Sequence, residues 1–288
     1  MHQAMLENSL EMKKINRFFL FISLVVILGS IGYVGYQQNW FGIHNQIVQG
    51  IRSRKVRFDD SHKKISLNKR QQIRQRLMRE TQPGLKKQGF VSVPTVGILE
   101  PVFNDAYSEK GLQAGANYAN RSDADPTGKQ APIMGESNYG LASHNFDDGL
   151  TGFSGLQQNY QDDEPYLVNG QRQTNDWLNH KAIYLANNHG IYEYRIKQQY
   201  LVKADDVHVL DPTKQPQVTI VTCLFPSKSY RIITVGNLKK SYAWDKAPTR
   251  VVAYFDLTKQ KTNAHADWYN PGVEEGVNGD AGGTKTIE

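Results

Sequence analysis

Cysteine is nearly absent from this chain of 288 residues, in which Cys223 is the only one. A single thiol cannot form an internal disulfide, which excludes the disulfide-stapled scaffolds of small secreted proteins. The chain also lacks the cysteine and histidine clusters of a zinc site. Cys223 closes the apolar run TIVTC, and Arg231 follows eight residues later; a permanently charged neighbour favours the nucleophilic thiolate. The pattern indicates a candidate nucleophile, with a buried core cysteine at a strand end as the alternative.

Charged residues are missing from residues 18–36, an apolar stretch of about 19 residues that is long enough to cross a bilayer as a helix. Arg17 and two lysines precede this stretch, whereas the next basic residue is Arg52. By the positive-inside rule, we expect a cytoplasmic N-terminus and an extracellular remainder, anchored in the cell membrane by a single span. A cleaved signal peptide is the alternative, but the apolar core is longer than the roughly 7 to 15 residues of such a region.

The net charge of +6 is unevenly distributed along the chain. Residues 37–82 carry eleven basic and three acidic side chains, a net charge of +8, whereas residues from 83 onward carry 20 basic and 23 acidic ones, a net charge of −3. A basic segment beside a membrane favours anionic lipid headgroups or an acidic wall polymer as its contact, and no nucleic acid is predicted as a partner. A solvated spacer is the alternative, because Ile73 and Leu77 form only a thin apolar stripe.

The sequence predicts five parts. These are a cytoplasmic tail (1–17), a transmembrane anchor (18–36), a basic extracellular stalk (37–85), a globular domain (86–257) and a flexible C-terminal tail (258–288) that is too polar and glycine-rich to pack. Six apolar runs in the globular domain are rich in β-branched and aromatic residues and predict strands: 90–94, 96–103, 181–187, 191–202, 218–223 and 230–236. Residues 187–190 predict a hairpin turn that uses positive φ at Asn and Gly, and short helices are expected within 111–120 and after Asp245. Many short strands with little helix predict an all-β barrel or sandwich.

A nucleophilic cysteine needs a proton acceptor, and the chain contains eight histidines. His144 differs from the others because it ends the small-residue run LAS just before a predicted Asp-Asp-Gly turn. A barrel strand would present such a side chain at its rim, where functional residues gather. An ordinary surface histidine is the alternative.

Taken together, TIVTC, the arginine before IITVG, and the upstream GESNYGLASH resemble a class A sortase of Gram-positive bacteria. The similarity extends over residues 89–238 and includes VGILEPVF and PIMGESNY. It implies a closed, eight-stranded β-barrel and a cysteine transpeptidase that acts on surface proteins bearing an LPXTG-type sorting signal. The acceptor that it implies is an amine of the wall precursor lipid II.

The resemblance also implies roles for single residues. Cys223 corresponds to the nucleophile that attacks the Thr–Gly carbonyl and forms a thioester, and His144 to the group that exchanges protons with the leaving and incoming amines. Arg231 corresponds to the residue that holds the substrate backbone and stabilises the oxyanion. Four further positions fall where the family lines its peptide groove, although barrel packing explains them equally well: Met134, Ala142, Val221 and Thr222.

No cofactor or metal is predicted. Residues 123–128 imitate the start of an EF-hand loop, but Met134 stands where the twelfth-position glutamate is needed, so we interpret the segment as a turn. The sequence therefore contains no recognisable calcium-binding site that would support a dependence on calcium. Both Asp-Pro pairs are followed by threonine, unlike the lid of pilin-polymerising sortases, and the connection 207–218 lacks the long helical insertion of class B, which favours a housekeeping enzyme. Two other functions stay open: a cysteine peptidase that hydrolyses wall peptides, and a non-catalytic wall-binding domain.

Overall fold

A computed structural model describes residues 2–37, 64–146, 148–158, 167–168, 171–172, 175–227, 229–265 and 274–279. The chain divides into two compact units, Met1–Ile47 and Val48–Glu288. The first unit contains helix α1 (His2–Gln37), within which Arg17–Val34 has a mean hydropathy of 2.1. This helix is long and apolar enough to cross a membrane, as is the helix of a signal sequence.

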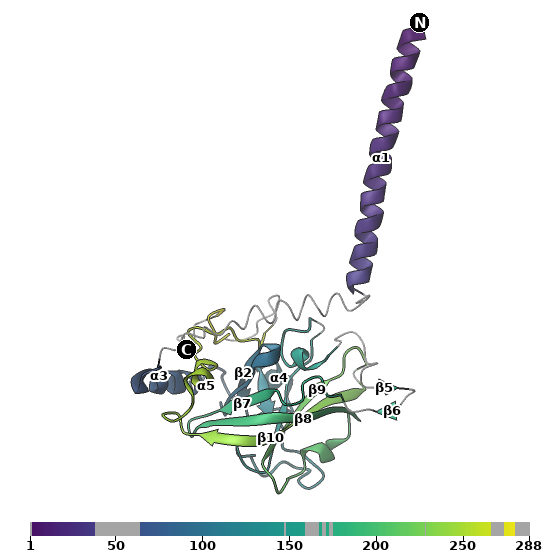
Figure 1. Ribbon diagram of the computed structural model, residues 1–288. Coiled ribbons are helices and arrows are strands. Elements are labelled where there is room, and N and C mark those ends of the chain that lie inside the picture. The colour runs from purple at the N-terminus through teal and green to yellow at the C-terminus, as the bar shows by residue number, and fades with distance from the viewer. Residues whose placement is uncertain are drawn as a thin grey trace. The chain divides into compact units, whose positions relative to one another are not determined.

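The second unit is built on a closed barrel of eight strands in the order β1-β2-β3-β4-β9-β10-β8-β7, which confirms the predicted barrel (Figure 1). The pairs β2–β3 and β4–β9 are parallel, and all the other neighbouring strands of the barrel are antiparallel. The eight strands are β1 (Gly89–Val93), β2 (Ile98–Phe103), β3 (Ala116–Tyr118), β4 (Asn138–Ala142), β7 (Ala182–Ala186), β8 (Ile191–Lys203), β9 (Gln217–Cys223) and β10 (Tyr230–Tyr242). The strands β5 (Leu167–Val168) and β6 (Gln171–Arg172) form a separate small pair.

Two barrel strands, β3 and β4, were not among the six that the sequence predicts. Strand β3 has only three residues, and β4 reads NYGLA, in which glycine and alanine weaken the strand pattern. The hairpin turn at 187–190 is confirmed, but positive φ is not found at Asn187 or Gly190. Instead, Asn187 Oδ1 accepts hydrogen bonds from the backbone N–H groups of His189 (2.8 Å) and Gly190 (3.1 Å).

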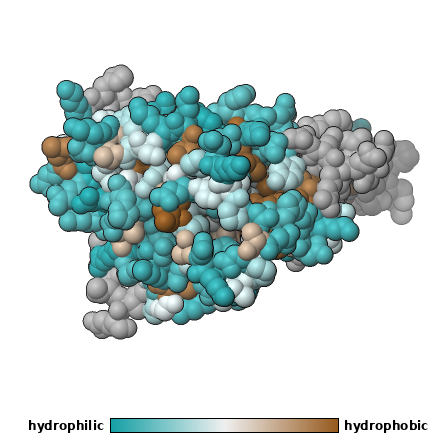
Figure 2. Space-filling view, turned by 90° about the horizontal axis from the view of Figure 1, so that it is seen from below, coloured by the Kyte–Doolittle hydropathy of each residue, from teal (hydrophilic) through white to brown (hydrophobic). Residues whose placement is uncertain are grey.

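Side chains from all eight strands fill the barrel interior, among them Val91, Ile98, Ala116, Leu141, Ile183, Tyr194, Ile220 and, at the edge, Leu238. The alternation of strand residues sends the intervening side chains to the outer face of the barrel. Short helical elements fill the connections: η2 (Pro94–Val96), α4 (Glu109–Ala114), η3 (Ser154–Leu156), η5 (Val207–Leu210) and α5 (Thr249–Ala253). Figure 2 shows one face of the molecule as mostly hydrophilic, with apolar side chains in small, separate patches.

Helix α3 (Leu67–Leu77) lies within the predicted stalk, yet it packs on the barrel. Ile73 and Leu77 are buried in one cluster with Phe90 of β1 and Val252 of α5. The guanidinium of Arg70 donates hydrogen bonds to the carbonyls of Trp244 (2.8 Å) and Ala247 (2.7 Å), which fixes the helix to the segment before α5. The thin apolar stripe is therefore sufficient for docking, and α3 belongs to the folded domain. Residues 38–63 of the predicted stalk lie outside the described residues.

The described part of the C-terminal segment, residues 258–265 and 274–279, is also folded against the barrel. The Glu275 side chain is buried in an ion pair with Lys87 and accepts a hydrogen bond from Thr81 Oγ1 (2.6 Å). Glu274 Oε2 lies 2.8 Å from His265 Nδ1, and both side chains are buried. Each of these buried charged groups has an oppositely charged or hydrogen-bonding partner, so the polar composition that predicts a flexible tail does not prevent packing here. The remaining tail residues lie outside the described ones.

Candidate active site

Cys223 and Arg231 are direct neighbours across two antiparallel strands. Cys223 is the last residue of β9, and its partner in the ladder is Arg231 of β10. Directly opposite residues present their side chains on the same face of a sheet. Because Ile220 of β9 belongs to the barrel interior, the alternation places Cys223 and Arg231 on the outer face. The nucleophile candidate and a fixed positive charge therefore lie side by side at the end of β9.

His144 reaches the same rim from β4. In the parallel β4–β9 ladder Ala142 pairs with Val221, so two further residues bring His144 level with Cys223. Hydrogen bonds hold the chain on either side of His144: Thr222 Oγ1 donates to Ser143 O (2.9 Å), and Asn145 Nδ2 donates to Cys223 O (2.7 Å). The structure thus brings together the three residues that the sequence singled out.

The surroundings of His144 favour its neutral form. Its side chain is 30% exposed, its ring makes an edge contact with Phe146, and Nε2 lies 3.9 Å from Glu109 Oε1. Burial lowers the pKa of His144, while the negative charge of Glu109 opposes part of that shift. At neutral pH the imidazole is therefore mainly neutral, and it can accept a proton.

Two neutral amides join the loop after His144 to the segment after Cys223. Asn145 Nδ2 donates to Gln157 Oε1 (2.7 Å) as well as to Cys223 O. Gln157 Nε2 donates to Phe225 O (2.7 Å), and its Oε1 accepts from Phe225 N (3.0 Å). Neither residue was predicted from the sequence. Asn145 could have been noticed because it follows His144, but Gln157 lies 68 residues from its partner and gives no local signal.

An apolar strip lies on the outer face of the barrel beside Cys223 and Arg231. It consists of buried side chains from β8 and β10 with flanking residues that include one from η5: Val202, Ile233, Val235, Tyr200, Val209 and Val221. Of the four predicted groove residues, Val221 and Ala142 are partly exposed and pair with each other next to the nucleophile. Met134 instead packs in the barrel interior, and Thr222 is buried. Met134 and Thr222 therefore belong to the packing of the barrel, which was the alternative to a position in the peptide groove.

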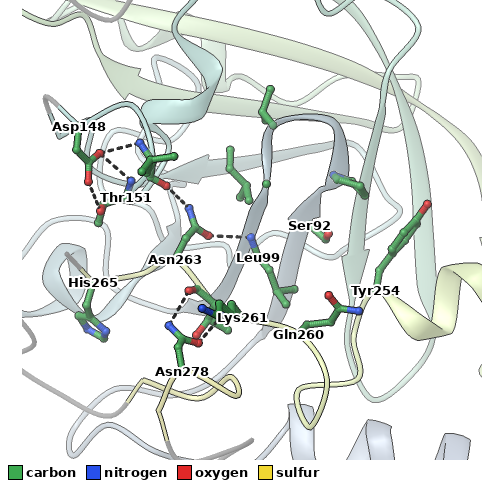
Figure 3. A pocket seen from close by; sticks show the side chains of 16 residues that line it. Ser92, Leu99, Asp148, Thr151, Tyr254, Gln260, Lys261, Asn263, His265 and Asn278 are labelled. Carbon is green, nitrogen blue, oxygen red and sulfur yellow. Dashed lines mark hydrogen bonds between the residues drawn. The ribbon is translucent and has the colours of Figure 1, made fainter. Parts of the chain in front are cut away.

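A cavity of about 200 Å³ lies away from the three candidate catalytic residues. Its lining includes the C-terminal residues Asn263, His265 and Asn278, and Figure 3 shows Asn263 between the strand residue Leu99 and the loop that carries Asp148 and Thr151. None of His144, Cys223 and Arg231 lines this cavity, but one of its walls is the loop that follows His144.

No group of three or more acidic, histidine or cysteine side chains that could hold a metal occurs among the described residues. Asp125, in the segment that imitates an EF-hand, accepts hydrogen bonds from its own loop: Gln130 N donates to Oδ2 (3.1 Å) and Thr127 Oγ1 to Oδ1 (3.4 Å). These bonds lower the pKa of Asp125 and are those of a turn.

Comparison with known proteins assigns the family. A sortase domain model matches residues 91–239. Sortase A of Streptococcus agalactiae is 26% identical over 270 residues, which cover 87% of this chain and 98% of that protein. Sortase A of Listeria monocytogenes is 27% identical over 154 residues, 53% of this chain and 57% of that protein, so this chain spans little more than half of its length. The crystal structure of the Listeria enzyme superposes with a TM-score of 0.41 at 26% identity, over 54% of this chain and 88% of that one.

The matched residues make up just over half of the chain, and they include His144, Cys223 and Arg231. The chain therefore belongs to the sortase family.

Proposed function

We propose that the chain is a membrane-anchored sortase of the class A type. It cleaves LPXTG-type sorting signals between Thr and Gly and transfers the protein to an amine of the peptidoglycan precursor lipid II. The observation that carries this proposal is the convergence of His144, Cys223 and Arg231 at one end of β9. The similarity to Streptococcus agalactiae sortase A over nearly the whole of that protein supports the class A type.

In the first half-reaction, the sulfur of Cys223 attacks the carbonyl carbon of the threonine in the sorting signal. Neutral His144 accepts the thiol proton and, as imidazolium, delivers it to the departing glycine amine, so that the C–N bond breaks and a thioester forms. Arg231 lies beside Cys223 on the same face, where its charge stabilises the oxyanion of the tetrahedral intermediate. The apolar strip that includes Val221 and Ile233 binds the apolar side chains of the sorting signal.

In the second half-reaction, the acceptor amine attacks the thioester carbonyl. His144, again neutral, takes the proton of the amine and returns it to the departing Cys223 sulfur, which restores the free enzyme. Helix α1 contributes by confinement, because it holds the enzyme on the membrane that carries both the sorting-signal protein and the lipid-linked acceptor. We place its N-terminus in the cytoplasm and the barrel outside. Protease added to intact, wall-stripped cells should therefore digest the barrel and leave a small protected N-terminal fragment.

We further propose that this chemistry needs no bound metal. The loop that imitates an EF-hand uses the carboxylate of Asp125 for its own backbone hydrogen bonds. Turnover in excess EDTA should equal turnover in millimolar calcium, and a strong dependence on calcium would contradict this part of the proposal.

The test is an assay with a fluorogenic LPXTG peptide, with and without an added amine such as triglycine. A sortase cleaves the peptide and, in the presence of the amine, forms a ligated product. A hydrolytic peptidase would cleave at a rate insensitive to the amine and form no ligated product. A wall-binding domain would do neither, and this result would refute the proposed function.

A further inference from the structure

Asn263, in the C-terminal segment beyond the sortase-domain match, is attached to β2 at two points. Its side-chain Oδ1 accepts a hydrogen bond from Leu99 N (2.8 Å), and its backbone N–H donates to Leu99 O (3.2 Å). Figure 3 shows the Asn263 side chain between Leu99 and the loop that carries Asp148 and Thr151. Because β2 is a barrel strand, Asn263 is fixed to the rigid part of the domain.

The other half of the same side chain holds the loop that follows His144. Asn263 Nδ2 donates to Leu150 O (2.9 Å) and to Gly152 O (2.8 Å), and Asn263 O accepts from Gly152 N (2.8 Å). An amide can make this set of bonds because it accepts on one side and donates twice on the other. A carboxylate of the same shape keeps the bond to β2 but repels the two loop carbonyls.

The held loop lies directly against the backbone of His144. Phe153 N donates to His144 O (2.8 Å), and Gly152 forms a β-bridge with Asn145. Gly152 has a φ of +62°, and a Cβ built on it would lie 2.4 Å from His144 O. The backbones of the two segments are in direct contact, so a displacement of residues 150–153 moves the backbone of His144 as well.

We propose that Asn263 is a positioning residue for His144, and that the C-terminal segment beyond the sortase-domain match completes the active site through it. The kinetic part of this inference rests on the proposed function. Thr222 and Asn145 hold the chain next to His144 from β9, and Asn263 holds the loop from the opposite side through β2. Release of the loop lets the His144 backbone shift and carries the imidazole away from its contact with Phe146, so we expect part of the burial that lowers its pKa to be lost.

The test compares two variants of the full-length protein with a matched control. Asn263→Ala removes all the side-chain bonds, and Asn263→Asp keeps the acceptor for Leu99 N but loses both donors to the loop. The control is Asn120→Ala, since Asn120 Nδ2 also donates to two carbonyls of one loop, those of Gly128 (2.7 Å) and Gln130 (2.9 Å). The loop that Asn120 holds precedes β4, whereas the loop that Asn263 holds follows His144.

Three quantities are measured for each variant: the melting temperature, kcat and KM on the LPXTG peptide, and the pKa of His144. The pKa is obtained by NMR of carbon-13-labelled histidine, with the His144 signal assigned through His144→Gln. The titratable or charged groups placed around His144, Glu109 of α4, Cys223 of β9 and Arg231 of β10, are unchanged in all three variants.

We expect both Asn263 variants to raise the pKa of His144 and to lower kcat by about 10-fold to 100-fold with little change in KM, as for misplacement of a reacting group. Asn120→Ala should leave kcat within about twofold of the wild-type value and the pKa of His144 unchanged. This should hold even if Asn120→Ala lowers the melting temperature as much as the Asn263 variants do. Wild-type values of kcat and pKa in Asn263→Asp would overturn the inference, as would an equal loss of kcat in Asn120→Ala. An inactive wild type would refute the proposed function instead, because the NMR titration needs no substrate.

Discussion

The active-site rim and the face beneath the C-terminal segment bury their polar groups in different ways. At the rim, neutral amides and hydroxyls such as those of Asn145, Gln157 and Thr222 bond to the backbone around partly exposed catalytic groups. Beneath the C-terminal segment, the side chains of Lys87 and Glu275 are 0% and 1% exposed and form an ion pair. Neutral groups cost little to desolvate and fix geometry, whereas buried charges are costly and depend on their partners. The rim is therefore expected to control activity, and the buried charges to control stability.

The largest effects on activity should come from the three candidate catalytic residues. Cys223→Ala should abolish transpeptidation, and His144→Ala should nearly abolish it. Arg231→Ala should lower kcat by about 10² to 10³, as for the loss of one oxyanion donor. The circular dichroism spectrum and melting temperature of each variant should stay close to those of the wild type, because all three side chains are partly exposed. Normal transpeptidation by Cys223→Ala would contradict the mechanism.

The largest effect on stability should come from the buried ion pair. Lys87 Nζ pairs with Glu275 and lies 5.4 Å from the ring centroid of Phe90 and 5.3 Å from that of Phe103. Lys87→Met leaves the Glu275 carboxylate buried without its cation, so the free energy of unfolding in urea should fall by about 3 to 5 kcal/mol.

The double variant Lys87→Met with Glu275→Gln serves as the control for the ion pair. It removes the uncompensated charge and should recover much of the loss of stability. If the two variants are equally unstable, packing of Lys87 rather than its charge is what stabilises this face.

The next effect concerns Glu100, a fully buried carboxyl of β2 whose Oε2 accepts a hydrogen bond from Ser143 Oγ (3.0 Å). Burial raises the pKa of Glu100 from 4.5 to about 8. At a pH between these two values, the folded protein keeps a proton on Glu100 that the unfolded chain has lost. The contribution of Glu100 to the free energy of unfolding is therefore fully present below its pKa in the unfolded chain, and it declines as the pH rises toward its pKa in the folded protein.

Glu100→Gln should flatten this decline, because glutamine keeps an acceptor for Ser143 and does not ionise. The measurement is the free energy of unfolding in urea at about pH 5 and about pH 8, with the wild type as reference. An equally steep decline in Glu100→Gln would assign the pH dependence to other groups.

The smallest effect should come from Glu109, whose side chain is 71% exposed and lies 3.9 Å from His144 Nε2. Its charge opposes the lowering of the His144 pKa by burial, and solvent screens an exposed pair. Glu109→Gln should therefore shift the His144 titration to lower pH without a measurable change in stability. An upward shift would mean that the electrostatic influence on His144 comes from elsewhere.

The strand pattern left a barrel and a sandwich open, and the family resemblance predicted the closed barrel, which the structure confirms. The roles of the three catalytic candidates stay a prediction, but the structure brings the three residues to one rim. The β-branched runs are long enough to show β8 and β9, and TIVTC and LASH mark residues that the β4–β9 pairing brings together. Short strands such as β3 carry too few residues for a pattern. Thr222 is buried because the alternation along β9 turns its side chain inward, whereas Met134 lies in the turn before β4 and packs into the barrel interior through contacts that the sequence pattern does not reveal.

The domain boundaries were harder to predict for a different reason. Helix α3 and the segment 274–279 are held by partners far away in the sequence: Arg70 by Trp244, and Glu275 by Lys87. Polar composition suggests solvation, but it does not reveal whether a distant partner satisfies a charge. A domain cut at residues 86 and 257 would lose both elements and leave Lys87 buried without Glu275.

The thioester mechanism is tested most sharply by intact-mass spectrometry of the wild-type protein mixed with an LPXTG peptide. We expect the mass of the protein to increase by that of the peptide portion up to threonine. The added mass should be located at Cys223, removed by hydroxylamine or an acceptor amine, and absent from Cys223→Ala. Cleavage of the peptide by Cys223→Ala, or cleavage by the wild type with no thioester under any quench, would contradict this mechanism.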